Sequence, residues 1–190
     1  EIGVRLVGSE MCIRDSVYVP EAIRRAIQAG VKSIEHGQLI DEPTMKLIAE
    51  KGVWLSMQPF IGEGNNHYST PEQQAKHELV VQGTENAYTL AKKYGVKLAW
   101  GTDLLFSPSN ARNQNLNIEK MTRWFSNYEI LKMITHDNAE LLALSGRRNP
   151  YPGTLGVIEE GALADLIVVD GNALEDIKAV SYTHLTLPTT

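Results

Sequence analysis

Three segments of the chain repeat one pattern of hydrophobic and polar positions, in which a helix-like stretch ends at a glycine and a short apolar run follows. The glycines are Gly30, Gly52 and Gly95, and a valine comes after each of them. Glycine suits the position that closes a helix, because it adopts a positive φ without a steric penalty at Cβ. The apolar runs are short and contain β-branched residues, as buried parallel strands do. The pattern predicts repeated αβ units whose strands cover residues 31–37, 53–57 and 96–103.

Signals for a helix start lie upstream of each of these glycines. Pro20 is a favoured first helical residue, and Asp41 can cap a second helix. A third helix is predicted to begin at the pair Thr70-Pro71. The polar stretch from 58 to 69 that precedes it is long for a connector in a compact domain, and such loops are typical of functional lids.

Two of the predicted strands end in groups that can bind a metal. The first ends at His36, and the third is followed by Asp103. In repeated αβ folds, reactive groups gather where strands end, because the loops converge there. Side chains alternate along a strand, so Ile34 shares a face with His36, while Ala99 and Gly101 share a face with Asp103. Small residues beside Asp103 indicate a crowded barrel interior.

Composition narrows the class of protein without identifying it. The chain has 190 residues, 43% of them hydrophobic, which is enough for the buried core of a soluble domain. Its net charge is −5, and acidic and basic residues are mixed along the sequence, so neither nucleic acid nor a membrane surface is expected as a partner. The single Cys12 excludes an internal disulfide framework. The cytoplasm, the periplasm and a homo-oligomeric state are all left open.

The two ends do not share the αβ pattern. Residues 1–16 and 181–190 resemble translated library-adapter sequence and are expected to be non-native. The metal-capable residues within them, Cys12 and His184, therefore carry no functional weight. The remaining chain is predicted to divide into a barrel part at 17–148 and a second part at 149–180.

Three motifs in this order resemble the amidohydrolase superfamily. They are the run 20–37 that ends in Glu-His-Gly, the tripeptide 101–103, and the run 161–171 with its Ala-Asp-Leu-Ile-Val-Val-Asp core. The likeness is strongest to imidazolonepropionase-like hydrolases and metal-dependent Xaa-Pro dipeptidases. It implies an α/β fold, with the end of strand 5 through strand 8 of a (β/α)8 TIM-like barrel. A portion of a small β-sandwich, which the family completes with residues from its N-terminus, would follow.

The resemblance also implies roles for individual residues. His36 matches the strand 6 metal ligand, and Asp103 matches the strand 8 aspartate that binds metal and moves a proton. One or two zinc ions are the expected cofactor, since zinc accepts such ligands and lowers the pKa of its bound water to about 7. Tyr18 matches a tyrosine whose hydroxyl can polarise a substrate carbonyl. Arg112, in a polar loop after Asp103, can clamp a substrate carboxylate.

Plainer readings exist for each of these residues. A histidine at a strand end is often a polar loop residue, and Gly-Thr-Asp can form a simple turn. Arg112 also fits a solvated loop position. His136, which precedes the apolar run 139–144, is predicted to lie at a helix start.

The expected function is a metal-dependent hydrolase of C–N bonds in amides or peptide-like molecules, with an Xaa-Pro dipeptide or an N-acyl amino acid as the small-molecule substrate. A cyclic amide hydrolase of imidazolonepropionase type is an alternative. Another is a non-catalytic fragment or scaffold piece, because the family's strand 1 His-x-His, strand 4 lysine and strand 5 histidine are missing. The chain alone is therefore expected to be inactive, since His36 and Asp103 are only two of the ligands that a site needs.

Overall fold

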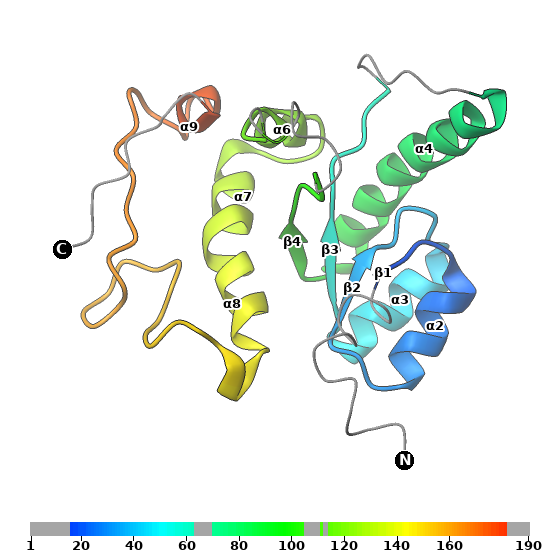
Figure 1. Cartoon of the computed structure of the whole chain (residues 1–190), viewed down its shortest axis with the longest axis horizontal. Coiled ribbons are helices and arrows are strands. Elements are labelled where there is room, and N and C mark those ends of the chain that lie inside the picture. Colours follow the sequence, from blue (N-terminus) through cyan, green and yellow to red (C-terminus); the bar gives the residue numbers. More distant parts are fainter. Residues whose placement is uncertain (1–15, 63–69, 105–110, 112–113, 182–190) are drawn as a thin grey trace. The chain divides into compact units, whose positions relative to one another are not determined.

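A computed structural model describes residues 16–62, 70–104, 111 and 114–181 of the chain. It divides into two compact units, residues 1–101 and residues 102–190 (Figure 1). Each unit is described by itself below.

The first unit is built on a parallel sheet. Its strands are β1 (Ser16–Val17), β2 (Ser33–His36), β3 (Trp54–Met57) and β4 (Leu98–Trp100), in the order β1-β2-β3-β4. Each strand pairs in parallel with the next one along the chain. The predicted α/β class with a parallel sheet is confirmed.

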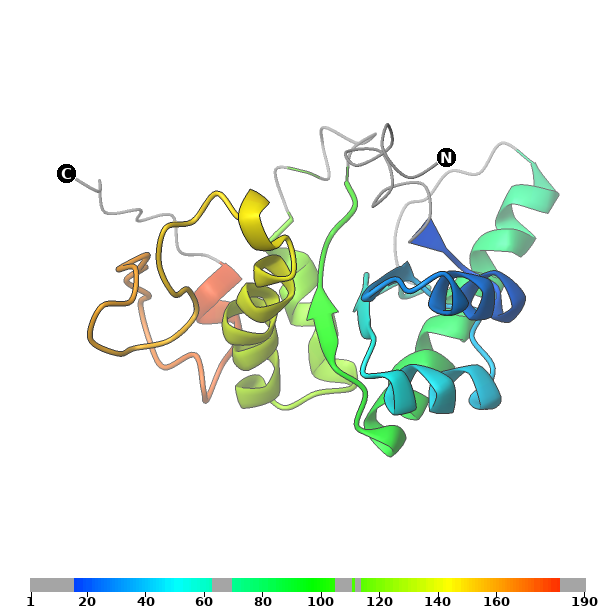
Figure 2. The same cartoon turned by 90° about the horizontal axis from the view of Figure 1, so that it is seen from below.

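A helix connects each strand to the next. These helices are α2 (Pro20–Gln28), α3 (Glu42–Lys51) and α4 (Pro71–Tyr94), and they lie on the same side of the sheet (Figures 1 and 2). The predicted caps are present, since the Asp41 side chain accepts a hydrogen bond from the Thr44 amide at 2.9 Å. Gly52 and Gly95 both close their helices in the left-handed conformation, with φ of 62°. The hydrophobic pattern therefore located these helix ends correctly.

The core of this unit lies between the sheet and the helices. Burying an aliphatic side chain contributes roughly 1.5–3 kcal/mol, so the buried apolar residues of this core supply most of the stability of the unit. At the surface, Lys93 and Tyr94 at the end of α4 donate hydrogen bonds to Glu42 at the start of α3. These bonds lower the pKa of the Glu42 carboxyl to about 2. The largest fully buried side chains of the unit are Ile23, Ile34, Met45, Ile48, Leu55, Met57 and Tyr88.

The regular elements of the second unit, in its described part, are helices. It contains α6 (Leu116–Lys120), η1 (Met121–Arg123), α7 (Asn127–Lys132), the π-helical turn η2 (Met133–Asp137), α8 (Asn138–Ala143), η3 (Gly146–Arg148) and α9 (Lys178–Ser181). Ser126 and Glu129 form a reciprocal capping box at the start of α7. The prediction that His136 begins a helix is wrong, because the helical segment already starts at Asn127 and passes through His136.

The apolar run at 164–170, whose pattern predicts a strand, does not form one in this structure. Between 149 and 177 the described backbone is irregular, and only Ile167 makes an isolated bridge. The side chains of Leu166, Ile167 and Val168 are 54–60% exposed. A strand needs a partner backbone to satisfy its amide and carbonyl groups, and the described part of this unit contains no strand to pair with it.

The structure also extends slightly into the two ends that were expected to lie outside the fold. Ser16 belongs to β1 and lies opposite Glu35 of β2. Ser181 belongs to α9, is buried, and its hydroxyl donates to the Asn115 carbonyl at 3.3 Å. Among the described helices, none combines the length and the apolar character needed to cross a membrane.

Helix α4 packs unusually close to the segment that follows β2. A Cβ atom on Gly83, near the middle of α4, would lie 2.3 Å from the carbonyl oxygen of Gln38. Three residues further along α4, the side-chain amide Nδ2 of Asn86 donates a hydrogen bond to the Ile40 backbone carbonyl at 3.0 Å. These contacts hold residues 37–40 against the helix, and they fix the position of Gln38.

We predict that Gly83→Ala destabilises the protein. Alanine in a helix interior is normally more stable than glycine by about 0.5–1 kcal/mol. Here the added methyl group meets backbone, so we expect a net loss of about 1–3 kcal/mol in the free energy of unfolding, as in overpacked cores. Urea unfolding measures this change. Gln82→Ala, at the exposed neighbouring position, is the control and should stay within about 0.5 kcal/mol of wild type. Stabilisation by Gly83→Ala would contradict the close packing.

Candidate active site

His36 is the last residue of β2 and has an unusual backbone conformation. Its φ is 78°, in the left-handed region, and the residue is only 9% exposed. Gly37 follows with φ of 73°, and its amide donates to the Val17 carbonyl at 2.8 Å. The backbone thus turns sharply at the end of β2 while it stays bonded to β1. This turn keeps the imidazole at the carboxyl end of the sheet.

Two side chains, those of Gln58 and Tyr18, contact the imidazole of His36, and Gln38 contacts Gln58. The Gln58 side-chain oxygen Oε1 lies 2.8 Å from His36 Nδ1. The Tyr18 ring stacks on the imidazole, with 4.7 Å between ring centroids and 12° between planes, and its hydroxyl lies 3.3 Å from the same nitrogen. Gln38 Nε2 donates to Gln58 Oε1 at 3.1 Å. The structure therefore brings two of the predicted site residues, His36 and Tyr18, together within the first unit.

Sequence reasoning missed Gln38 and Gln58. The polar pattern predicts that Gln58 begins a lid, whereas Gln58 is buried, with only 6% of the residue exposed. Gln38 is fully buried, two residues after His36. Gln58 directly follows β3 and Gln38 lies two residues after the end of β2, so both are near strand ends of a parallel sheet, where site residues gather. That position was the signal that could have identified them.

Asp103 belongs to the second unit and lies three residues beyond the end of β4. It is exposed, and its φ is 51°. Within the described part of the chain, His36 and Asp103 are the two residues other than glycine with a positive φ. Residues held in such conformations cost roughly 1–3 kcal/mol and are concentrated at functional sites. The two metal ligands implied by the family resemblance therefore share a rare backbone feature.

Two other predicted features, the substrate clamp and most of the lid, are not part of the described structure. Arg112, the predicted substrate clamp, lies outside the described residues. Most of the predicted lid, residues 63–69, also lies outside them. The described beginning of that segment, residues 58–62, starts with the buried Gln58 and so contributes to the interior of the first unit.

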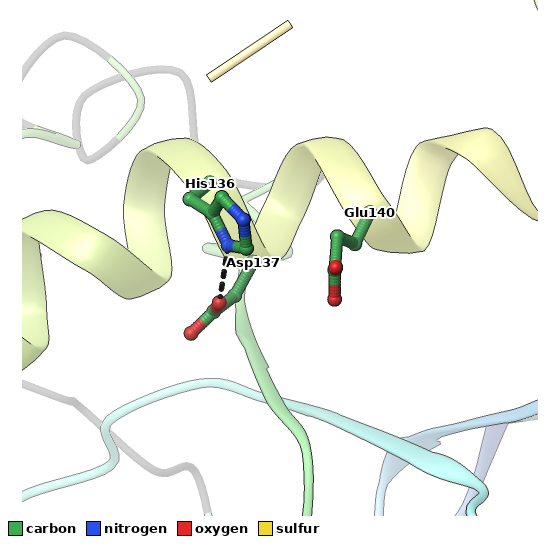
Figure 3. Close-up of side chains that lie close together, drawn as sticks. All are labelled: His136, Asp137 and Glu140. Atoms are coloured by element: carbon green, nitrogen blue, oxygen red, sulfur yellow. Dashed lines mark hydrogen bonds and ion pairs between the residues drawn. The ribbon is translucent and has the colours of Figure 1, made fainter. Parts of the chain in front are cut away.

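A second cluster of metal-capable side chains lies in the second unit. His136, Asp137 and Glu140 each offer a ligand atom, and these atoms lie within 4.8 Å of one another. Figure 3 shows His136 beside the Asp137 carboxylate, with Glu140 one helical turn further along. His136 Nδ1 is 2.9 Å from Asp137 Oδ1. The Lys132 ammonium binds the same carboxylate, so the chain itself already supplies a cation to Asp137.

A cavity of about 520 Å³ adjoins this cluster between α8 and residues 149–157. Its wall combines His136 and Glu140 with the apolar side chains of Leu142 and Leu155. The backbone of Gly156 lies directly on the π-helical turn, because a Cβ atom there would be 2.8 Å from both His136 Cα and the Thr135 carbonyl oxygen. This contact holds the loop against the helix.

Comparison with known proteins identifies the family. The sequence profile of the amidohydrolase family matches residues 19–186. The chain belongs to the amidohydrolase family. It is 31% identical over 166 residues to the ochratoxinase of Aspergillus niger, a match that covers 85% of the chain and 33% of that protein. The chain thus spans about a third of the length of the curated relatives it matches.

Solved structures of similar proteins agree with this assignment. A prolidase in complex with N-methylphosphonate-L-proline is 34% identical to this amidohydrolase chain, with a TM-score of 0.73, over 87% of the chain and 40% of the prolidase. An Xaa-Pro dipeptidase with bound methionine is 28% identical, with a TM-score of 0.74. The match covers 90% of the chain and 42% of the dipeptidase. The expected fold class, part of a (β/α)8 barrel, is confirmed by these matches.

We predict that Gly156→Ala destabilises the second unit more than Gly161→Ala does. Both glycines have a positive φ, 72° and 86°, so both substitutions cost about 1–2 kcal/mol from backbone strain. Only Gly156 also meets neighbouring backbone, whereas nothing lies within 4 Å of a Cβ on Gly161. The extra loss at Gly156 should be about 1–3 kcal/mol, measured by thermal unfolding of both variants. Equal losses would show that the loop does not rest on the π-helical turn.

Proposed function

We propose that a full-length amidohydrolase carrying this chain is a metal-dependent hydrolase of C–N bonds in peptide-like amides. Family membership supports the class of reaction. The observation that supports the site is the local backbone of His36 and Asp103, the ligands implied by the resemblance. His36 ends β2, Asp103 lies three residues after β4, and both have a left-handed backbone conformation. Such a strained conformation persists only where neighbouring contacts maintain it, and residues of this kind cluster at functional sites.

Each of these two side chains is of a kind that binds zinc. Zinc is bound by histidine nitrogen and by carboxylate oxygen, and His36 and Asp103 offer one of each. When bound, zinc lowers the pKa of a water ligand to about 7 and so supplies a nucleophile at neutral pH. Catalytic zinc takes about three protein ligands, so these residues make up part of the set. The exposed Asp103 carboxylate would also accept a proton and pass it to the leaving amine.

The proposed substrate is an Xaa-Pro dipeptide or a related N-acyl amino acid. Support comes from the similar prolidase, whose bound molecule carries a phosphonate group on proline, and from the similar Xaa-Pro dipeptidase. Such substrates end in a carboxylate, and Arg112 would bind it through its planar guanidinium. Tyr18 would polarise the scissile carbonyl with its hydroxyl. In this structure that hydroxyl lies beside His36 Nδ1.

We predict that Asp103→Asn and His36→Asn inactivate the full-length enzyme in different ways. Asparagine tolerates the left-handed conformation at both positions, so the substitutions change chemistry more than backbone. Asp103→Asn loses charge and basicity and should lower kcat by about 10²-fold or more, without rescue by added zinc. His36→Asn should mainly lower metal occupancy, so excess zinc should restore part of the activity. Turnover of Xaa-Pro dipeptides and N-acyl amino acids, with metal content from elemental analysis, measures both effects.

Asp165→Asn is the matched control, because Asp165 is also an exposed aspartate of the second unit. It should leave kcat and metal content unchanged. Near-normal turnover in Asp103→Asn would remove Asp103 from the mechanism. If the wild-type enzyme bound zinc but hydrolysed neither substrate class, the proposed substrate would be wrong, whereas the proposed metal site would still hold.

A further inference from the structure

Gln58 places its side-chain oxygen at one ring nitrogen of His36. The distance from Gln58 Oε1 to His36 Nδ1 is 2.8 Å, and both residues are buried, at 6% and 9% exposure. The contact joins the ends of neighbouring strands, because His36 closes β2 and Gln58 directly follows β3. A hydrogen bond in this buried position is stronger than the same bond in water.

A third side chain, that of Gln38, contacts the Gln58 amide. Gln38 Nε2 donates to the same oxygen, Gln58 Oε1, at 3.1 Å. An amide oxygen can accept hydrogen bonds and cannot donate them, so both neighbours of this oxygen must be donors. His36 Nδ1 therefore carries the ring proton in the neutral imidazole. Gln38 is itself held in place, since Gly83 of α4 packs on its carbonyl.

We infer that Gln58, oriented by Gln38, is a positioning residue that holds His36 in the Nδ1–H tautomer and fixes the plane of its ring. The lone pair is then on Nε2, the nitrogen that would bind the metal. This inference rests on the proposed function, in which His36 is a metal ligand. Histidines that bind metals commonly donate their other ring N–H to such a partner, and loss of the partner typically lowers metal affinity about 10–100-fold.

Tyr18 is the competing candidate for this role. Its hydroxyl lies 3.3 Å from the same nitrogen, longer than the bond to Gln58, and its ring stacks on the imidazole. A phenol hydroxyl can both donate and accept, so it is compatible with either tautomer. The Gln58 oxygen is compatible with one tautomer only. Gln58 therefore selects the tautomer, while Tyr18 contributes to the orientation of the ring.

The test combines spectroscopy and metal binding in the full-length enzyme. With ¹⁵N-labelled histidine and the metal removed, long-range ¹H–¹⁵N NMR at pH 8 reports which nitrogen of His36 carries the proton, with His36→Asn used to assign the signal. We expect a protonated Nδ1 in wild type. Gln58→Met keeps the length of the side chain but removes the amide oxygen, so Nδ1–H should no longer dominate. Zinc affinity, measured by competition with a chelating dye, should fall about 10–100-fold.

Gln58→Glu and Tyr18→Phe separate the alternatives. Glutamate retains an acceptor oxygen at the same position, so it should restore both the Nδ1–H signal and most of the zinc affinity. Tyr18→Phe keeps the ring and should leave the tautomer unchanged. Gln82→Met, on the exposed face of α4, is the control for the substitution itself.

Each outcome decides the inference. An Nε2–H tautomer in wild type would overturn it, even if Gln58→Met failed to fold. An unchanged tautomer in Gln58→Met, or a switch in Tyr18→Phe, would overturn it as well. Failure of the proposed function looks different: if His36→Asn retained full metal content, His36 would not be a ligand, although the NMR result would still establish how its ring is held.

Discussion

The parallel pairing of β2 with β3 is the contact on which the candidate site depends. It brings the ends of both strands to the same edge of the sheet, and so places Gln58 against the imidazole of His36. The pairing of β1 with β2 adds Tyr18 at the same edge. Because side chains alternate along a strand, a shift of one residue in either register would turn these groups to the opposite face. The buried apolar side chains between sheet and helices therefore fix the site by fixing the register.

Backbone strain and side-chain bonding act together at His36. The left-handed conformation of His36 and the glycine after it turn the chain sharply, and the Gly37 amide remains bonded to β1. Strain of this kind persists only where neighbouring contacts hold it. Those contacts are the stacked Tyr18 ring and the Gln58 oxygen. A rigid imidazole is what a metal site requires, since ligands must be held near their productive geometry before the ion arrives.

The second unit contains a cluster of metal-capable side chains that has contacts of its own within the chain. His136, Asp137 and Glu140 lie close enough to share an ion, but Lys132 already balances the Asp137 carboxylate. The π-helical turn at this point accommodates the backbone of Gly156, so the helix and the loop that lines the cavity are packed together. Ligand chemistry alone does not distinguish such a cluster from a functional site.

The αβ order, the helix ends at Gly52 and Gly95, the Asp41 cap and the place of His36 at a strand end could all be predicted from the sequence, because they depend on local propensity. The sequence did not reveal that Gln38 and Gln58 are buried beside His36, since their 20-residue separation in the chain is closed only by strand pairing. It also predicted a strand near Leu166, where the apolar pattern was right but the described part of the unit has no partner strand. Local signals specify elements, whereas partners, burial and hydrogen bonds across strands are decided by the tertiary structure, because they depend on residues that are distant in the chain.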